Sequence, residues 1–483
     1  MVRLVSFTLD HVRNVRHGVI GFPILASGGS ITGIYGANGS GKTSVVDALA
    51  LLRQTMSGMP VAASCGELVT IGEDTMSLTA VFLLDVQPCP YVKYSVEYRK
   101  DGMGLGIGQE SICLLDSPEQ AGRPIVVNDN TKTTELGLSP ECLWRSVAAN
   151  HGGRNAVVFA RNDAKLERCS YLFSGDFLAL VSAAGTGGSE LPVKAASRVH
   201  EVVALSGAVQ RLKAYAEKNI SVLSAKRTAC VDYNLLPLGM PADDGEPSAR
   251  SLDLLGGNTV SEDGMEWLDR NIRLFNQVLP VMVSGLTIRL KRIGTTLVGD
   301  GRTVVRFEPV SVRDGAEVPL RDESEGVIRI IGLLAYLIRA FNDPDACVAV
   351  DGLDESMFEY LFGGMLEEFA KGARGQLIFT AHNLRTLERM QPVEDTIVLS
   401  TVDPYDRFIP YQNTGKIDNP RTRYLNALLL GGTTVPLYEE HTPQLIGAGL
   451  TLASAERTQI DEQVEEGMRS LMDVPIDGLD GVL

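Results

Sequence analysis

The sequence predicts an α/β fold with an inserted α/β subdomain and a mixed sheet, which has a parallel core and an antiparallel N-terminal part. A glycine-rich stretch, GANGSGKT at 36–43, stands between a strand-like and a helix-like segment. Two short apolar runs, ACVAVD at 346–351 and QLIFTAH at 376–382, each follow a helical pattern, as buried parallel strands do. Strand-like runs separated by turn residues fill 65–115 and predict antiparallel pairing.

Composition and charge narrow the class of protein. The 483 residues are 44% hydrophobic and 22% charged, which is ordinary for a globular protein of two or three domains. The net charge of -16 restricts any contact with nucleic acid to a local basic patch. The seven cysteines include no CxxC pair, which favours a reducing, cytoplasmic location. The most apolar stretch, at 327–341, contains Arg329 and Arg339, so no membrane association is expected.

The first half of the chain reads as strands followed by helices. Residues 2–10 alternate as a strand does, and 29–36 form a second strand that leads into the glycine-rich stretch. Residues 42–56 show the helical spacing of apolar side chains. The pattern of 116–195 is mixed, and 196–232 is predicted to be helical.

The second half alternates helix and strand. A helix is predicted at 265–282, two strands at 286–294 and 303–312, and a helix at 323–341 before the first buried run. We expect five parts in all. They are an N-terminal lobe of the core at 1–64, a β-rich lobe with a mixed insertion at 65–195, a mainly helical insertion at 196–280, a C-terminal lobe of the core at 281–400 and a C-terminal extension at 401–483.

The glycine-rich stretch matches the phosphate-loop pattern GxxxxGK[ST] in full. Its glycines let backbone N–H groups turn toward phosphate oxygens, Lys42 adds a positive charge, and the Thr43 hydroxyl can ligate Mg²⁺. The sequence therefore predicts an ATP and Mg²⁺ site. The nucleotide-binding residues predicted from this stretch are Gly36, Asn38, Gly39, Ser40, Gly41, Lys42, Thr43 and Ser44.

The form GxNGSGKT, with LVSFTLDHVRNV before it, resembles the loop and opening strand of ABC-type head ATPases, including the SMC and recombination-repair group. The resemblance assigns Arg13 to the nucleotide and identifies a shortened signature motif in Ser324, Glu325 and Gly326. In such dimers this helix start faces the nucleotide on the other subunit. Asp351 ends a Walker B strand and is a second Mg²⁺ ligand, and His382 matches the histidine that senses the terminal phosphate.

A closer resemblance is to bacterial AAA-type (AAA_15/AAA_21, OLD-like) ATPases, over roughly 1–60 and 265–400. It implies a homodimer or higher homo-oligomer that sandwiches two ATP·Mg²⁺. It further implies a separate nuclease or effector partner and a role in anti-phage defence. The C-terminal extension shows no convincing DxD after an apolar strand, so we expect no nuclease domain in this chain.

One residue departs from the family pattern. The position after Asp351 usually carries a glutamate that orients the attacking water, and here it is Gly352. Three alternatives stay open: Asp354 or Glu355 reaches the water, hydrolysis is slow and the protein acts as an ATP-held clamp, or another residue or a partner completes the site. We expect weak ATPase activity, with Asp351, Asp354, Glu355 and His382 as candidate catalytic residues, and we expect Gly352→Glu to raise turnover.

The sequence thus predicts an ABC-class head ATPase that acts as a nucleotide-driven dimerising switch. Two rival functions follow from the same motifs. The first is a DNA repair or segregation ATPase that binds DNA directly, which the acidic charge and the lack of long heptad repeats disfavour. The second is a scaffold that holds ATP and hydrolyses it poorly.

Overall fold

The computed structural model describes most of the first 411 residues. The described ranges are 1–84, 89–133, 135–149, 152–186, 199–224, 235–237, 251–254, 258–297, 303–355, 357–384, 388–389, 396–401 and 403–411. The chain divides into two compact units, Met1–Tyr424 and Leu425–Leu483. The second unit, and with it nearly all of the predicted C-terminal extension, lies outside the described residues. The account below concerns the first unit alone.

A six-stranded sheet forms the centre of the nucleotide-binding half, with the strand order β19-β18-β3-β17-β16-β9. All neighbours are parallel except β18 and β19. Its strands are β3 (Ser30–Gly36), β9 (Ile220–Leu223), β16 (Cys347–Val350), β17 (Gln376–Thr380), β18 (Ile397–Ser400) and β19 (Phe408–Pro410). Every residue of β16, β17 and β18 is buried, which explains their continuous apolar runs.

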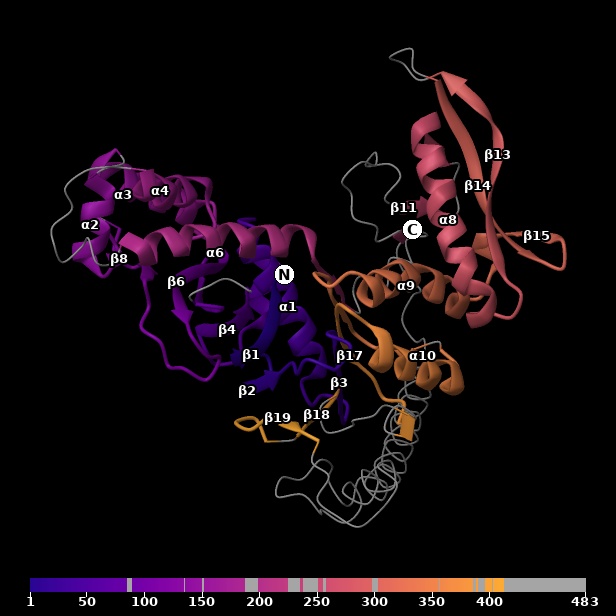
Figure 1. Ribbon diagram of the computed structural model, residues 1–483, viewed down its shortest axis with the longest axis horizontal. Coiled ribbons are helices and arrows are strands. Elements are labelled where there is room, and N and C mark those ends of the chain that lie inside the picture. Colours follow the sequence, from indigo (N-terminus) through magenta and orange to yellow (C-terminus); the bar gives the residue numbers. More distant parts are fainter. Residues whose placement is uncertain are drawn as a thin grey trace, which may run out of the picture. The chain divides into compact units, whose positions relative to one another are not determined.

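Three helices pack against this sheet (Figure 1). They are α1 (Lys42–Met56), α9 (Glu325–Asn342) and α10 (Glu359–Gly372). The helix α1 begins directly after the glycine-rich stretch, and α9 begins after Ser324 in an extended conformation. Parallel strands place their carboxyl ends on one edge, so the ends of β3, β16 and β17 meet where α1 begins.

A second, seven-stranded sheet is antiparallel and has the order β2-β1-β4-β5-β6-β7-β8. Its strands are β1 (Arg3–Val12), β2 (Val15–Gly21), β4 (Thr75–Leu83), β5 (Tyr91–Asp101), β6 (Gly104–Leu115), β7 (Val126–Asp129) and β8 (Leu138–Ser139). A 3-10 helix, η1 (Ala63–Leu68), lies before β4. Side chains of β5 alternate between buried and partly exposed, so one face of the sheet carries the core.

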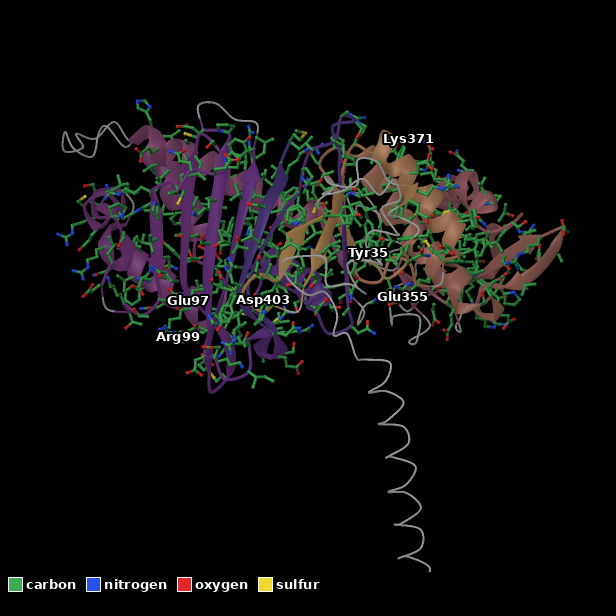
Figure 2. All side chains as sticks on the ribbon, turned by 90° about the horizontal axis from the view of Figure 1, so that it is seen from below. Tyr35, Glu97, Arg99, Glu355, Lys371 and Asp403 are labelled. Atoms are coloured by element: carbon green, nitrogen blue, oxygen red, sulfur yellow. The ribbon has the colours of Figure 1, made fainter. Side chains whose placement is uncertain are left out.

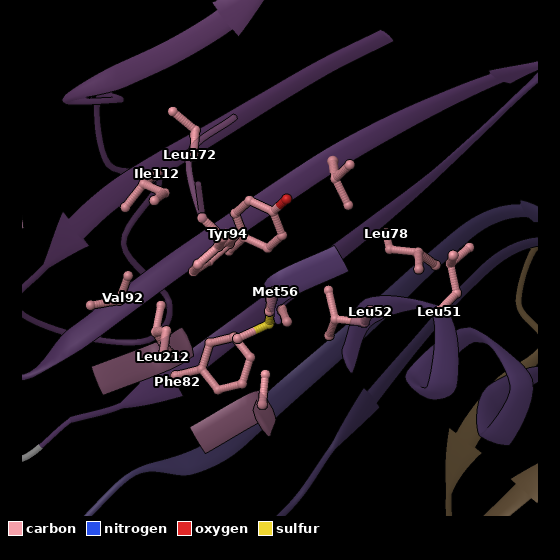
Figure 3. Close-up of a cluster of buried hydrophobic side chains, with 14 of the residues drawn as sticks. Leu51, Leu52, Met56, Leu78, Phe82, Val92, Tyr94, Ile112, Leu172 and Leu212 are labelled. Carbon is pink, nitrogen blue, oxygen red and sulfur yellow. The ribbon is translucent and has the colours of Figure 1, made fainter. Parts of the chain in front are cut away.

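The main hydrophobic core lies between this antiparallel sheet and helices that cross it (Figure 3). Leu52 and Met56 of α1 meet Phe82 of β4 and Tyr94 of β5 there, together with Leu212 of α6. The helices on the far part of the sheet are α2 (Glu141–Ala149), α3 (Gly153–Leu166), α4 (Gly175–Thr186) and α6 (Val199–Lys218). Because α1 belongs to both halves, the phosphate loop is anchored in the largest buried cluster.

A smaller antiparallel sheet, β12-β14-β13 with β15 paired to β14, precedes α9. Its strands are β12 (Asn258–Val260), β13 (Thr287–Leu297), β14 (Thr303–Arg313) and β15 (Ala316–Pro319), and the long helix α8 (Glu262–Met282) packs on β13. The short strands β10 (Leu235–Pro237) and β11 (Ser251–Asp253) pair with each other, and η4 (Leu320–Asp322) leads into α9. Ser261 begins α8 by accepting a hydrogen bond from the backbone N–H of Gly264.

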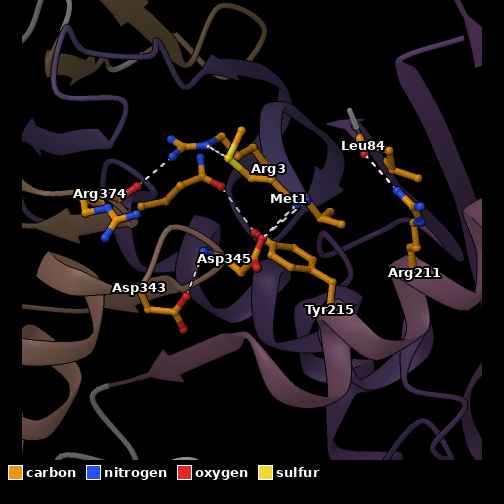
Figure 4. Close-up of polar contacts among 10 residues, drawn as sticks. Met1, Arg3, Leu84, Arg211, Tyr215, Asp343, Asp345 and Arg374 are labelled. Atoms are coloured by element: carbon orange, nitrogen blue, oxygen red, sulfur yellow. Dashed lines mark hydrogen bonds and ion pairs between the residues drawn. The ribbon is translucent and has the colours of Figure 1, made fainter. Parts of the chain in front are cut away.

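Polar contacts join the two ends of the nucleotide-binding half (Figure 4). Arg3 donates to the carbonyl of Arg374 at 2.6 Å, and the backbone N–H of Val2 donates to Asp345 at 3.2 Å. The buried amide of Gln376, at the start of β17, exchanges hydrogen bonds of 2.9 and 2.8 Å with the backbone of Leu4. These contacts fix β1 to the strands that carry the distant motifs, although more than 340 residues separate them in sequence.

The predicted fold class is confirmed by the parallel sheet, the antiparallel sheet and the position of the glycine-rich stretch. One predicted element needs correction, and one strand was missed. The helix predicted at 196–232 ends at Lys218, and the residues after it form β9, because its apolar side chains complete the edge of the parallel sheet. The strand β2 was not predicted at all. The five-part division stays a prediction. No helix in the described part of the chain is long and apolar enough to cross a membrane.

Candidate nucleotide site

The phosphate loop runs from the end of β3 into α1 and is shaped by glycine. Gly39 and Gly41 have φ of 77° and 99°, a left-handed backbone that residues with a Cβ rarely adopt. The ammonium of Lys42 is buried and donates to the carbonyl oxygens of Gly36 and Ala37, both at 2.9 Å. Burial lowers the pKa of Lys42, and the nearby carboxylates of Asp351 and Asp354 oppose that shift. The loop thus places the positive charge of Lys42 beside its own backbone carbonyl groups.

Asp351 lies directly beyond β16, next to the first turn of α1. Its Oδ1 accepts hydrogen bonds from the hydroxyl groups of Thr380, at 2.6 Å, and Thr43, at 3.2 Å. The Thr380 hydroxyl also accepts a hydrogen bond of 2.7 Å from the backbone N–H of Gly352. This arrangement brings the two predicted Mg²⁺ ligands together, since carboxylate and hydroxyl oxygens suit that ion. Sequence reasoning did not single out Thr380, although it lies in the quoted run before His382.

Asp354 makes a structural contact that the sequence did not predict. Its Oδ2 accepts hydrogen bonds from the backbone N–H groups of His382 and Asn383, at 2.9 and 2.7 Å. The carboxylate therefore ties the turn after β16 to the loop after β17. Asp354 does not line the cavity above Lys42, whereas His382 does. Among the described residues its Oδ1 has no hydrogen-bond partner, so its part in orienting water stays a prediction.

The turn that follows Asp351 is built on Gly352, whose φ is 62°. A Cβ on this residue would lie 2.4 Å from Oε1 of Glu355, which is closer than such atoms come in proteins. The other oxygen, Oε2 of Glu355, forms an ion pair of 2.8 Å with Arg329 of α9. Arg329 also donates to the carbonyls of Gly352, at 2.7 Å, and Asp351, at 3.3 Å. Figure 2 marks Glu355 and Tyr35, which come from this turn and from β3.

Arg13 reaches the site from the turn between β1 and β2. Its guanidinium forms an ion pair of 2.7 Å with Asp47 of α1, and it lines the cavity. Next to it, the amide of Asn14 donates to the carbonyl of Gly39 in the loop. Arg407 in turn donates to the carbonyl of Asn14 at 2.7 Å. A second support comes from the Ser400 hydroxyl, which donates to the carbonyl of Ser40 at 2.7 Å. The β18–β19 hairpin thus holds the outer side of the loop, a contribution that no short motif indicates.

A cavity of about 450 Å³ opens over the loop. It is lined by Arg13, Asn14, Asn38, Gly39, Gly41, Lys42, Thr43, Ser44, Asp351, Gly352, Glu355, Thr380 and His382. Gly36 and Ser40 belong to the loop but not to the lining, and the buried Ser40 hydroxyl has no hydrogen-bond partner among the residues that the structure describes. A buried cation, turned backbone N–H groups and adjacent oxygen ligands fit a nucleotide phosphate chain with Mg²⁺. Lys42 and the loop would hold the phosphates, and Thr43 and Asp351 would hold the metal.

The shortened signature motif is not part of this cavity. Ser324, Glu325 and Gly326 are absent from its lining, and they begin α9. Ser324 and Glu325 are exposed, and the Ser324 side chain makes no hydrogen bond to its own helix. Of the predicted groups, these three and Asp354 are missing from the cavity lining and the loop, and the others lie together within one chain.

Comparison with known families agrees with these features. Residues 31–79, which contain the loop and α1, match the family model described as "AAA domain, putative AbiEii toxin, Type IV TA system". The matched segment is that of an AAA-type ATPase domain, and it covers the part of the chain that carries the phosphate loop. The match confirms the resemblance drawn from the motifs. A comparison with curated proteins gave no match.

Among solved structures, the chain is similar to head domains of SMC proteins. It is 12% identical to the Smc head domain of Pyrococcus furiosus bound to the C-terminal domain of ScpA, covering 85% of this chain and 97% of that one, with a TM-score of 0.39. The SMC head domain from Thermotoga maritima is 13% identical, with coverage of 85% and 99% and a TM-score of 0.35. These values carry no conclusion about function.

Proposed function

We propose that this chain hydrolyses ATP slowly and uses ATP binding to bring two copies of itself together. The cavity over Lys42 carries the proposal, because it combines a phosphate loop with a paired Thr43 and Asp351 and an exposed His382. When bound, Mg²⁺ would screen the phosphate charge. In this proposal Lys42 binds the terminal phosphates and His382 contacts the terminal phosphate from the opposite side.

The start of α9 supports the dimer. Helix starts bind anions through free N–H groups, and here Ser324 and Glu325 are exposed and stand apart from the chain's own cavity. In a head-to-tail dimer this helix start would contact the nucleotide held by the other copy. Each of the two nucleotides is then enclosed by the loop of one subunit and Ser324–Gly326 of its partner.

The dimer can be tested by light scattering on the purified protein at micromolar concentration, with Mg·ATP and with no nucleotide. We expect a dimer with ATP and a monomer without it. Lys42→Ala should stay monomeric because it loses the nucleotide. Ser324→Arg should bind ATP but stay monomeric, whereas Ser117→Arg, at an exposed loop residue of the antiparallel lobe, should dimerise normally. A wild-type monomer that binds ATP would contradict the sandwich.

We further propose that the switch acts on a separate effector, a nuclease or toxin, in antiviral defence. The family that residues 31–79 match is described by a toxin of a type IV toxin–antitoxin system, which supports this direction. Phage plating on cells that carry the gene with its neighbours, beside Lys42→Ala, tests it. Protection that needs Lys42 is the expected result, and equal plaque counts with and without the gene set would contradict it.

A further inference from the structure

The geometry around Gly352 points to Glu355, three positions further along the chain, as the residue that supplies the carboxylate missing at position 352. We propose that Glu355 orients the attacking water in place of a residue after Asp351, and that Arg329 is the positioning residue that holds it. This inference rests on the proposed ATPase function, which it refines. It selects one of the alternatives that the sequence left open.

Glu355 occupies the volume that a side chain at residue 352 would need. Its Oε1 lies 2.4 Å from the point where the first side-chain atom of residue 352 would be. The carboxylate therefore enters the cavity beside the place from which a glutamate at 352 would extend. A side chain at 352 would occupy the position that the Glu355 carboxylate now takes. Glu355 can therefore hold this position only because residue 352 is a glycine. Glu355 lines the cavity, as Asp354 does not.

The two carboxylate oxygens of Glu355 have different partners. Arg329 binds Oε2 at 2.8 Å, while in the described part of the chain no hydrogen bond to Oε1 is found. A carboxylate in the cavity lining that has one oxygen held by a cation can accept a hydrogen bond from water at the other oxygen. The Glu355 side chain is 58% exposed, so without Arg329 nothing described would fix its direction.

Arg329 contacts the backbone of the turn as well as the carboxylate of Glu355. Its side chain is largely buried and donates to the carbonyls of Asp351 and Gly352, which form the turn itself. One guanidinium thus sets the path of the turn and the direction of the carboxylate. A planar donor with several N–H groups can make these contacts together, and a lysine cannot.

Arg329 also links the two ends of the proposed mechanism. It lies five residues after Ser324 on α9, about 7.5 Å along the helix axis. The start of that helix is the part proposed to meet the other subunit's nucleotide. A shift of α9 on dimerisation would therefore move Arg329 and change the position of Glu355. Hydrolysis in one site becomes dependent on engagement with the partner.

The reaction balances without any further group. The oxygen of water bonds to the terminal phosphorus, the bond from that phosphorus to the bridging oxygen of ADP breaks, and one water proton passes to Glu355 and then to solvent. The products are ADP and phosphate. Arg329 takes no part in proton transfer.

The test is steady-state phosphate release by the full chain with Mg·ATP, together with ATP binding. We expect Glu355→Gln to lower kcat by at least about 100-fold and to leave ATP affinity within about threefold, because the lost group acts on water and not on the nucleotide. Arg329→Met should lower kcat by about 10-fold or more through misplacement of Glu355. Arg329→Lys should be intermediate.

A double mutant separates positioning from a merely structural role. Arg329→Met should cause no further loss of kcat in the Glu355→Gln background, because it acts through that residue. Glu368→Gln removes an exposed acid paired to Lys371 on α10, and Arg339→Met removes another arginine of α9 that binds backbone carbonyl and carboxylate groups. Both controls should keep wild-type kcat, even if Arg339→Met melts at a lower temperature.

Several outcomes would overturn the inference. They are wild-type kcat in Glu355→Gln, an equal loss from Arg329→Met in both backgrounds, and no turnover by a wild-type protein that binds ATP, even in a single-turnover assay. If Arg329→Met unfolds below the assay temperature, Arg329→Lys decides the same question. Failure of the wild type to bind ATP would instead overturn the proposed function.

Discussion

Two arginines, Arg161 in the antiparallel lobe and Arg329 beside the nucleotide cavity, are held in different ways. Arg161 is 2% exposed, and each of its three guanidinium nitrogens donates to the protein: Nε to Asn128, Nη1 to the carbonyls of Lys132 and Leu136, and Nη2 to that of Asp129. Arg329 is also largely buried, but its Nε has no partner within the described ranges, and its carboxylate partner is 58% exposed.

The surroundings of the two residues repeat this contrast. Asn128 connects Arg161 to the buried Glu110, donating to Glu110 at 3.0 Å. Glu110 also accepts hydrogen bonds from the Tyr94 hydroxyl and the backbone N–H groups of Tyr171 and Leu172. Burial, and then the charge of Glu110, raise the pKa of Tyr94 well above its usual value. A fully bonded network of this kind fixes one conformation, while the incomplete set around Arg329 leaves room for change.

The largest expected effect on stability is therefore in the antiparallel lobe. Arg161→Met would remove the donor to the buried Asn128 side chain and to the carbonyls of Lys132, Leu136 and Asp129, and should lower the free energy of unfolding by about 3–5 kcal/mol. Urea denaturation measures this loss. Arg145→Met, at an exposed arginine of α2 paired with Glu141, should change it by less than about 0.5 kcal/mol. Equal losses in the two variants would show that the network around Arg161 adds little.

An intermediate effect is expected at the turn after Asp351. The sequence alone predicts that Gly352→Glu raises turnover, but the structure predicts that it lowers turnover. The left-handed φ of 62° should cost about 1–2 kcal/mol for any L-residue, and the new Cβ would displace Glu355.

A matched glycine separates backbone strain from this displacement. Gly315, in the turn between β14 and β15, has a φ of 81° and open space around it. Gly315→Glu should lose similar stability and keep full turnover. A rise in kcat for Gly352→Glu would contradict the role given to Glu355.

A change in stability of similar size is expected at Thr380. Thr380→Val removes the hydroxyl that forms hydrogen bonds with both Asp351 and the backbone N–H of Gly352. It should lower the free energy of unfolding by about 1–3 kcal/mol. Because it orients a proposed metal ligand, it should raise the Mg²⁺ concentration needed for half-maximal turnover by about 10-fold or more. Thr32, on the adjacent strand β3, has a buried hydroxyl with no hydrogen-bond partner in the described part of the chain. Thr32→Val should therefore leave the Mg²⁺ requirement unchanged. The same Mg²⁺ requirement in both variants would place the metal elsewhere.

The parts of the site that could be predicted are those encoded in short stretches. The phosphate loop needs only local glycines and the strand and helix beside it, and α1 has the predicted bounds. Asp351 and His382 followed from buried strands that end at the same edge. The glycine at 352 was recognised as a departure, but the turn it forms and the direction of Glu355 depend on contacts that no local pattern records.

The missed residues act across long sequence separations. Arg407 supports the phosphate loop through Asn14, 393 positions away, and Arg329 reaches Gly352 from 23 positions earlier. Their partners are mainly backbone carbonyls, which any residue supplies and which therefore leave no signal in the sequence. The strand β9 was hidden for a similar reason, since a short run of three apolar residues and one serine after a helix fits a continued helix as well as an edge strand.

The most direct test of the account is steady-state phosphate release by the purified chain with Mg·ATP, measured beside Lys42→Ala. The account predicts slow turnover in the wild type and none in Lys42→Ala, whose buried ammonium is the charge at the centre of the loop. Equal phosphate release by both proteins would mean that the cavity over the loop is not the site of hydrolysis.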